Sequence, residues 1–170
     1  MQVLFTPPQL SLTIRRMAAQ LVENSSDISK LFFVGIQPRG VFFAEKLMAE
    51  IQKLYPGQPV NYGILDITFY RDDVRNALHA PSKTNISFSI EGQKVILIDD
   101  VLYTGRTIRA ALDALQDFGR PARVELCVLV DRRFNRELPI QPDFWGRSLD
   151  TISSQKVKVD WDKEEVVIYT

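Results

Sequence analysis

The chain has 170 residues, 45% of them hydrophobic and 25% charged, and its 21 basic and 21 acidic side chains give a net charge of zero. This length and composition predict one globular domain, 1–170, and the zero charge excludes a global basic field, so that any nucleic-acid surface must be a local patch. The chain has one cysteine, Cys127, which excludes an internal disulfide or a cysteine-metal cluster. The sequence shows no signal peptide and no apolar run near the ~18 residues of a membrane span, and this favours a cytoplasmic protein.

The first expected element is an amphipathic helix that begins at Thr6-Pro7-Pro8-Gln9. Threonine suits the N-cap, proline the first helical position, and glutamine the third position of a capping box. The apolar residues that follow at helical spacing predict its buried side: Ile14, Met17, Ala18, Leu21 and Val22. Arg15 and Arg16 fall on the opposite side, and their simplest interpretation is a solvated helix face.

The apolar run 31–36 predicts a buried strand, followed by the loop Gln37-Pro38-Arg39-Gly40 and a second helix. The apolar face of that helix is expected at Val41, Ala44, Leu47, Met48 and Ile51. An arginine and a glycine in a loop before a helix N-terminus are typical of an anion site. Proline has no N–H to donate there, and an X–Pro bond can be cis, so the bond between residues 37 and 38 is a candidate cis peptide.

A turn at Pro56-Gly57 separates this helix from the next expected strand, 60–69. The residues of that strand expected to face inward are Ile64, Leu65 and Ile67. The strand leads into Tyr70-Arg71-Asp72-Asp73, where the chain becomes polar.

The polar stretch 74–84 is long for a loop inside a compact domain. Such a loop is usually functional or disordered, and its position suggests a lid over an active site. His79, the only histidine, lies in it. An exposed side chain is the simpler interpretation of this histidine, and a catalytic role is the alternative.

The most informative stretch is Val95–Thr107, which reads V-I-L-I-D-D-V-L-Y-T-G-R-T. Val95–Ile98 predicts a strand buried on both faces of a parallel sheet, and Asp99 and Asp100 follow at its carboxyl end, where ligands bind in open α/β sheets. Thr104–Thr107 then forms a tight turn that opens a third helix. The apolar stripe and the end of that helix are expected at Ile108, Ala111, Leu112, Leu115, Phe118, Gly119 and Pro121.

This order of residues suits a sugar phosphate. A turn rich in threonine and glycine at a helix N-terminus offers N–H groups and the positive end of the helix dipole to a phosphate, and Gly105 permits close approach. Two carboxylates nearby can accept hydrogen bonds from sugar hydroxyls. The turn has no lysine and no G-K-[ST] element, which excludes a Walker loop. Taken alone, Asp99-Asp100 could equally be a helix cap or a surface turn.

A further buried strand is expected over 123–130, ending in Asp131-Arg132 at the same sheet edge, where both residues are candidates for lining a ligand pocket. The tail of the chain alternates between apolar and polar residues on either side of a polar turn, 162–164, and this pattern predicts a β-hairpin. The alternating residues are Val157, Val159, Trp161, Val166 and Ile168.

Val95–Thr107 resembles the phosphoribosyl-pyrophosphate (PRPP) binding motif of type I phosphoribosyltransferases, and D-D-V-L-Y-T-G-R-T resembles the wording of the PyrR family. Members of that family are pyrimidine-operon attenuators and uracil phosphoribosyltransferases. Four matching blocks cover nearly the whole chain. The resemblance implies an α/β fold: a Rossmann-like, mostly parallel sheet flanked by helices, with a small hood and a C-terminal β-hairpin. The hood over the base would come from 133–140 and 143–146.

Carried onto this sequence, the resemblance implies three groups of site residues. They are, for PRPP, Gly40, Asp99, Asp100, Tyr103, Thr104, Gly105, Arg106 and Thr107; for catalysis, Arg39, Asp99 and Asp100; and for the lid and base pocket, Arg71, Asp72, Asp131 and Arg132. The two acids would hold the ribose hydroxyls, the turn 104–107 the 5′-phosphate, and the loop at 39–40 the pyrophosphate.

The resemblance also implies Mg²⁺ as cofactor, bound mainly through the oxygens of PRPP without a dedicated protein cage. Uracil would be the second substrate, and UMP and UTP would act as product or effector. The family associates into oligomers, which implies a homo-oligomer, a dimer or higher.

Members of this family also bind the leader mRNA of pyrimidine operons through a basic face that typically carries histidines. Here Ala19 stands in the first helix, and Arg133-Phe134-Asn135 stands where the family usually has Gly-His, with one residue more. The remaining candidates for phosphate contacts are Arg15, Arg16, Arg136, Arg147 and Thr151. Three functions stay open. The first is a uracil phosphoribosyltransferase that also regulates genes through RNA. The second is a phosphoribosyltransferase without an RNA-binding role, for another base such as a purine, and the third is a non-catalytic RNA-binding regulator.

Overall fold

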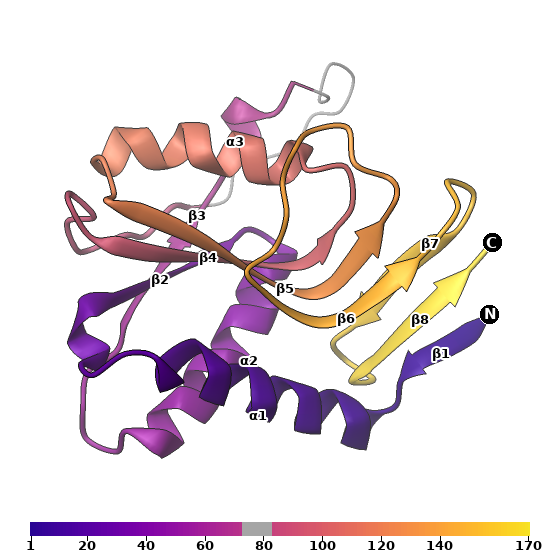
Figure 1. Cartoon of the computed structure of the whole chain (residues 1–170), viewed down its shortest axis with the longest axis horizontal. Coiled ribbons are helices and arrows are strands. Elements are labelled where there is room, and N and C mark those ends of the chain that lie inside the picture. The colour runs from indigo at the N-terminus through magenta and orange to yellow at the C-terminus, as the bar shows by residue number, and fades with distance from the viewer. Residues whose placement is uncertain (73–82) are drawn as a thin grey trace.

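The computed structural model describes residues 1–72 and 83–170, and its main body is a parallel β-sheet of five strands (Figure 1). The strands are β2 (Leu31–Ile36), β3 (Asn61–Leu65), β4 (Lys94–Leu102), β5 (Arg123–Arg133) and β6 (Phe144–Asp150), in the spatial order β3-β2-β4-β5-β6. Every adjacent pair in this sheet runs parallel. The expected α/β class is therefore confirmed.

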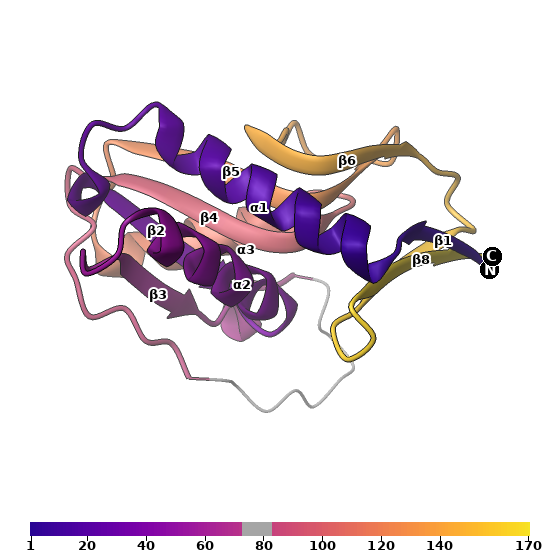
Figure 2. The ribbon, with the colours of Figure 1, turned by 90° about the horizontal axis from the view of Figure 1, so that it is seen from below.

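Helices cover both faces of this sheet (Figures 1 and 2). α1 (Pro7–Glu23) and α2 (Arg39–Leu54) lie on one face and α3 (Arg106–Leu115) on the other. Alternate residues of β4 join two cores, because Ile96 and Ile98 pack with α1 and α2 whereas Val95 and Leu97 pack with α3. Burial on both faces explains the continuous apolar run. Short 3₁₀ helices are η1 (Ile28–Lys30), η2 (Thr68–Tyr70) and η3 (Gln116–Phe118).

The order of the strands creates a switch point between β2 and β4. The chain leaves β2 through α2 toward β3 on one side, and leaves β4 through α3 toward β5 on the other. The two strands pair in parallel, with Gly35 opposite Ile98, so their carboxyl ends meet at one edge. Ligands of open α/β sheets bind in the crevice at such a point. The loops after β2 and β4, which the sequence suggests as anion sites, flank it.

A second, antiparallel sheet lies beside the first and brings the two ends of the chain together (Figure 2). The predicted hairpin is present as β7 (Lys156–Asp160) and β8 (Glu165–Tyr169). The sequence does not predict its third strand, β1 (Gln2–Phe5), which pairs with β8. Four residues carry too little periodicity to show a strand.

The predicted capping box of α1 is confirmed, since the Thr6 N–H donates to Gln9 Oε1 at 3.0 Å.

The strand expected over 60–69 is shorter than predicted, because β3 ends at Leu65 and η2 follows. The Asp66 carboxylate accepts hydrogen bonds from the Thr68 N–H at 3.0 Å and from the Thr68 hydroxyl at 2.6 Å. This local turn competes with the sheet for the backbone groups. Ile67 is still buried, whereas Phe69 is 81% exposed.

The expectation that 143–146 belongs to a hood is wrong. Residues from Phe144 onward form β6, the edge strand of the main sheet, with Phe144 opposite Cys127. This pairing gives β5 a hydrogen-bonded neighbour on its second side and removes an open sheet edge from the core. The segment 134–143 remains as the loop between β5 and β6. The Cys127 thiol is buried, as predicted.

The buried side of α3 differs in part from the expected stripe. Its buried residues are Ile108, Ala110, Ala111, Ala114 and Leu115. Leu112, inside α3, is 37% exposed, and Phe118 is 36% exposed. Phe118 leaves the helical face because the α-helix ends at Leu115 and the tighter 3₁₀ turn of η3 follows. No helix within residues 1–72 and 83–170 is long and apolar enough to cross a membrane.

Candidate active site

The two neighbouring acids lie inside the end of a strand rather than after it. β4 continues to Leu102 instead of ending at Ile98, because it pairs with β5 along this length, and β5 likewise extends to Arg133. The hydrogen-bonded ladder therefore holds the backbone of Asp99 and Asp100 at the edge of the switch point between β2 and β4. This corrects the predicted strand end and gives the acids a rigid support.

Asp99 and Asp100 are both buried, with 7% and 5% of their surfaces exposed. Asp99 Oδ1 accepts a hydrogen bond from the Asp100 N–H at 2.9 Å, and Asp100 Oδ1 accepts one from the Val101 N–H at 2.7 Å. Burial raises the pKa of both carboxyls, and the charge of Asp100 raises the pKa of Asp99 further. The positive charge of Arg39 opposes both shifts. Buried acids with shifted pKa values beside a cation are typical of a functional site.

The turn after β4 has the geometry that the sequence predicts for a phosphate site. Gly105 is the N-cap of α3 and has a φ of 94°, a left-handed conformation that favours glycine. A helix start without a capping side chain is typical of an anion site. Thr104 Oγ1 accepts a hydrogen bond from the Arg106 N–H at 3.3 Å, which shapes the turn. Tyr103 precedes the turn, and Thr107 is the second residue of α3.

Acidic side chains surround Arg106 at the start of α3. Its guanidinium forms ion pairs with Asp72 at 3.0 Å and with Glu137. Arg109, one turn further along α3, reaches Asp72 at 3.1 Å. These pairs bring the residues after η2, Arg71 and Asp72, next to the phosphate turn. The sequence interpretation missed Glu137 and Arg109, because no local pattern shows which distant charge each side chain meets.

Asp73 and most of the expected lid, including His79, lie outside the described residues, 1–72 and 83–170. On the far side of this gap the Thr84 hydroxyl accepts a hydrogen bond from the Asp66 N–H at 2.9 Å. Asn85 then forms an isolated antiparallel bridge with Ile64 of β3. The chain therefore rejoins the main sheet beside β3.

Arg39 and Gly40 are the first residues of α2, directly after the loop that follows β2. The peptide bond between Gln37 and Pro38 in that loop is cis. A Cβ atom on Gly40 would lie 2.5 Å from the Ile98 carbonyl oxygen and 3.0 Å from the Asp99 Cα. Glycine therefore lets α2 pack directly on the backbone of β4 beside the acids. This packing role of Gly40 adds to the pyrophosphate contact that the resemblance implies.

Replacing Gly40 with alanine is expected to lower the free energy of unfolding by about 2 kcal/mol, because the new methyl group meets backbone atoms that cannot turn away. Chemical denaturation measures this loss. Gly57→Ala is a matched control: nothing lies within 4 Å of its Cβ position, and its φ of 76° makes alanine cost only about 1 kcal/mol. A smaller loss in Gly40→Ala than in the control would contradict the packing role.

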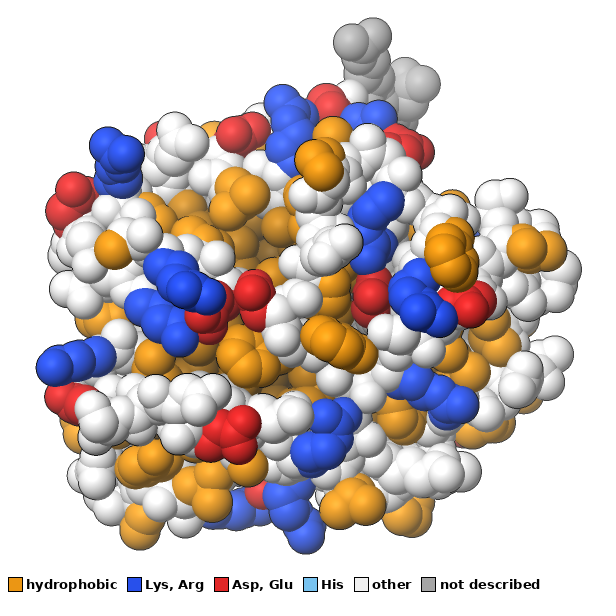
Figure 3. Space-filling model, in the orientation of Figure 1, with side chains coloured by type: hydrophobic (Ala, Val, Ile, Leu, Met, Phe, Trp, Pro, Cys, Tyr) orange, Lys and Arg blue, Asp and Glu red, His pale blue; other side chains and the backbone are white. Residues whose placement is uncertain are grey.

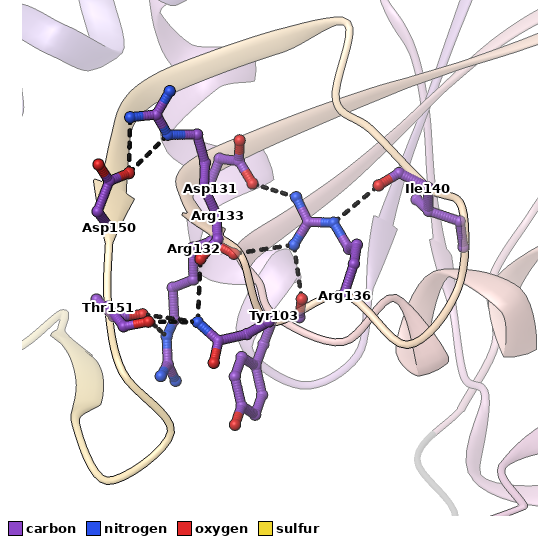
Figure 4. A network of polar contacts seen from close by, with 9 residues as sticks. Tyr103, Asp131, Arg132, Arg133, Arg136, Ile140, Asp150 and Thr151 are labelled. Atoms are coloured by element: carbon purple, nitrogen blue, oxygen red, sulfur yellow. Dashed lines mark hydrogen bonds and ion pairs between the residues drawn. The ribbon is translucent and has the colours of Figure 1, made fainter.

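Side chains from three segments meet at the end of β5 (Figure 4). Arg132 is buried, and the centre of its guanidinium lies 3.9 Å from the centre of the Tyr103 ring. Arg132 Nε donates to Thr151 Oγ1 at 3.0 Å. Asp131 is buried as well and pairs with Arg136. Tertiary contacts thus hold both candidate pocket residues, Asp131 and Arg132, at the carboxyl edge of the sheet.

The candidate RNA contacts differ in how free their side chains are. The Arg15 side chain is 65% exposed. Arg16 and Arg147 each donate to a backbone carbonyl, in β6 at 3.0 Å and in β1 at 2.8 Å. Arg136 is bound within the chain, and Thr151 is buried. Basic and acidic side chains lie next to one another over the face in Figure 3, in keeping with the zero net charge.

A magnesium ion in this site would find few protein ligands. Within residues 1–72 and 83–170, no three side chains of His, Cys, Asp or Glu lie close enough together to hold a metal ion. Asp99 and Asp100 are the carboxylates of the switch point. This donor set fits Mg²⁺, which usually keeps several waters and takes its other oxygens from a bound phosphate.

Comparisons with known proteins show which family the chain belongs to. Residues 4–164 match the family model described as phosphoribosyl transferase domain. A bifunctional protein PyrR from Picosynechococcus sp. is 52% identical over 148 residues, which cover 86% of this chain and 82% of that protein. One from Elusimicrobium minutum is 47% identical over 164 residues, 94% and 90% of the two chains. The chain belongs to the PyrR family of phosphoribosyltransferases.

Solved phosphoribosyltransferases have the same fold. A hypoxanthine phosphoribosyltransferase from Staphylococcus aureus superposes with a TM-score of 0.67 and 22% identity, covering 88% of this chain and 78% of that one. One from Trypanosoma cruzi gives a TM-score of 0.71 with 16% identity, covering 99% and 91%. Membership of the PyrR family confirms the resemblance seen in Val95–Thr107 and makes this protein a transferase of pentosyl groups.

Proposed function

We propose that this PyrR-family protein transfers the phosphoribosyl group of PRPP to uracil and releases UMP and pyrophosphate, acting in the cytoplasm as one domain over 1–170. One observation carries the proposal: the buried acids Asp99 and Asp100 lie at the sheet edge shared by the loops after β2 and β4. PRPP has hydroxyls between two phosphate groups, so its chemistry matches this order of acceptors and donors. A purely regulatory protein would not need two buried acids whose ionised forms are disfavoured by burial.

Each part of PRPP has its own partners in this proposal. The carboxylates of Asp99 and Asp100 accept hydrogen bonds from the ribose hydroxyls. The turn 104–107 binds the 5′-phosphate with the N–H groups of the first turn of α3. Arg39 binds the pyrophosphate, and Arg132, at the end of β5, lies beside uracil.

In the proposed reaction, uracil N1 attacks the anomeric carbon while the bond from that carbon to the pyrophosphate oxygen breaks, and the N1 proton is released to water. The sugar passes through an oxocarbenium-like transition state, and the pyrophosphate leaves with the bonding electrons. Arg39 stabilises the charge that grows on the leaving group, and the ionised acids stabilise the positive sugar. Mg²⁺, held mainly by PRPP, adds charge neutralisation when bound. Arg39 also favours ionisation of the acids, because its charge opposes the rise in their pKa values.

Pyrophosphate release from PRPP in the presence of Mg²⁺ tests this function, with uracil, hypoxanthine and orotate compared. Turnover with uracil alone is the expected result. Turnover with another base would keep the PRPP site and reject the uracil assignment. PRPP binding without turnover on any base would favour a regulator that uses PRPP or UTP as an effector.

We also propose that the protein binds the leader mRNA of pyrimidine genes, most directly through Arg15, Arg16 and Arg147. The word bifunctional in the names of the relatives supports a second role. Arg136 and Thr151 are left out of this surface, because the Arg136 side chain is only 20% exposed and Thr151 is buried. Arg15, Arg16 and Arg147 are exposed. A phosphoribosyltransferase without RNA binding is the alternative, and the residues at 19 and 133–135 favour it.

Self-association of the protein into a dimer or larger oligomer is expected and is measured by sedimentation.

Gel-shift binding to a pyrimidine-operon leader, with and without uridine nucleotides, tests the RNA role. In the double variant Arg15→Gln, Arg16→Gln, the affinity is expected to fall about tenfold at moderate salt, because two phosphate contacts are lost. Lys53→Gln, an exposed substitution in α2 that removes one positive charge, is the comparison away from this surface. Absence of any shift with the unmodified protein would leave only the enzyme.

A further inference from the structure

Arg136 lies at the centre of the network drawn in Figure 4. Its side chain is 20% exposed, and its guanidinium donates to oxygens from three separate segments. Nη1 donates to the Tyr103 carbonyl at 2.6 Å and to the Arg132 carbonyl at 3.1 Å, and Nε donates to the Ile140 carbonyl at 2.8 Å. Nη2 pairs with the Asp131 carboxylate. All three nitrogen atoms of the guanidinium therefore donate hydrogen bonds inside the protein.

The residues that bind Arg136 belong to segments that border the candidate site. Tyr103 directly precedes the turn 104–107, and its ring lies under the Arg132 guanidinium. Asp131 and Arg132 form the end of β5. Ile140 is in the loop between β5 and β6. The end of β4, the end of β5 and this loop thus share one guanidinium.

The residues after Arg136 reinforce the same connection. The N–H groups of Glu137 and Leu138 donate to the Thr104 carbonyl at 2.9 and 3.2 Å. A Cβ on Gly105 would lie 3.3 Å from Ile140 Cδ1 and 3.4 Å from Leu138 Cβ, so this loop packs against the turn. The segment 136–140 therefore packs against the turn 104–107, and the Arg136 side chain holds the start of this segment in place.

We propose that Arg136 is a positioning residue, which orders the turn 104–107 for the 5′-phosphate and couples it to the base side of the site at the end of β5. This inference rests on the proposed function, because it takes that turn to be the phosphate site of PRPP. It assigns to Arg136 a role inside the catalytic half of the molecule and not on an RNA-binding face. Buried Asp131 supplies the countercharge that makes an arginine stable at this place.

The geometry calls for arginine and not merely for a positive charge. Three carbonyls and a carboxylate lie in different directions around the guanidinium, a planar group with five N–H donors. A lysine has one compact ammonium group and cannot reach all of these oxygens. Arg136→Lys is therefore expected to restore only part of what Arg136→Gln loses.

Two measurements on the full chain test the inference, with Arg133→Gln as the matched control. Arg133 is the last residue of β5, three residues before Arg136, its side chain is 51% exposed, and it pairs with Asp150 at 2.6 Å. The first measurement is amide hydrogen exchange of the protein without ligand. Arg136→Gln should speed exchange of the Glu137 and Leu138 N–H groups, and Arg133→Gln should not.

The second measurement is steady-state kinetics with PRPP and uracil. In Arg136→Gln the KM for PRPP is expected to rise about tenfold, with a smaller change in kcat, because a turn that is less ordered binds the phosphate less well. Arg136→Lys should fall between this variant and the unmodified protein. If Arg136→Gln does not fold, Arg136→Lys alone decides through the same two measurements.

The outcomes separate the inference from the function it rests on. Equal exchange and equal KM values in the Arg136 and Arg133 variants would overturn the positioning role. A loss of RNA binding in Arg136→Gln with both measurements unchanged would return Arg136 to the RNA surface. If the unmodified protein neither binds nor turns over PRPP, the proposed function fails, and the exchange result still decides whether Arg136 orders the turn.

Discussion

Replacing Arg39 with alanine is expected to lower the turnover number with PRPP and uracil by about 100-fold, while the thermal midpoint stays nearly unchanged. Arg39 is exposed at the start of α2, so little packing is lost with its side chain. Its charge, however, acts on both buried acids. The variant therefore loses the cation proposed to stabilise the leaving pyrophosphate, and it loses the charge that favours ionisation of Asp99 and Asp100.

Arg120→Ala is the matched control, because this exposed arginine lies at the opposite edge of the sheet, where its carbonyl accepts a hydrogen bond from the Gly92 N–H. It should turn over at the unmodified rate. Arg39→Lys keeps a charge but loses the planar fork, and we expect partial activity. An unchanged turnover number in Arg39→Ala, measured at saturating PRPP, would remove Arg39 from the catalytic machinery.

Replacing Asp99 with asparagine is expected to have two opposite effects, a fall in turnover of about 100-fold and a rise in stability at neutral pH. The turnover falls because the variant loses a negative charge next to the reacting sugar. The amide oxygen of asparagine can still accept the hydrogen bond from the Asp100 N–H, which is 2.9 Å long, so the local backbone is preserved. The stability rises because a buried charge next to a second acid is removed.

The pH dependence of this stability effect has a definite sign. Burial and the charge of Asp100 hold the pKa of Asp99 above its ordinary value of 3.8, so the folded state binds this proton more tightly than the unfolded state. The contribution of Asp99 to stability is therefore fully present below pH 3.8 and is lost as the pH rises through the folded pKa. Asparagine does not ionise, so the variant should gain about 3 °C or more in thermal midpoint at pH 7 and lose this advantage in acid.

Thermal unfolding at several pH values measures this gain, with Asp162→Asn as control. Asp162 is exposed in the turn between β7 and β8, and its substitution should change neither turnover nor the pH profile. A lower midpoint for Asp99→Asn at neutral pH would show that the Asp99 charge is stabilising. That result would contradict the unfavourable effect assigned to the buried charge of Asp99.

Local patterns predicted the parts of the molecule whose physics is local. The capping box at Thr6 and Gln9, the buried strand 31–36 and the hairpin in the tail each depend on residues close in sequence. The same holds for the turn 104–107, where one glycine at a helix start defines the backbone. The family resemblance then supplied roles for Asp99, Asp100 and Arg39 that periodicity alone could not.

Longer-range features could not be predicted in this way. β1 exists because β8 offers it an edge, and β6 because β5 does, so neither segment shows its state in isolation. The strand expected over 60–69 ended early because one side chain, Asp66, competes for the Thr68 N–H. The strand preference of four alternating residues is weak compared with a hydrogen bond of this kind.

The sequence by itself therefore determined the fold class and the backbone of the turn 104–107, and it pointed to the two acids as candidate site residues, because each depends on a continuous stretch of the chain. The tertiary structure decided how strongly the acids are buried, that Gly40 packs on β4, and that Arg136 joins three segments. These properties arise from contacts between residues far apart in sequence. Burial, charge compensation and hydrogen bonding at a distance depend on which surfaces the fold brings together, and only the folded chain contains that information.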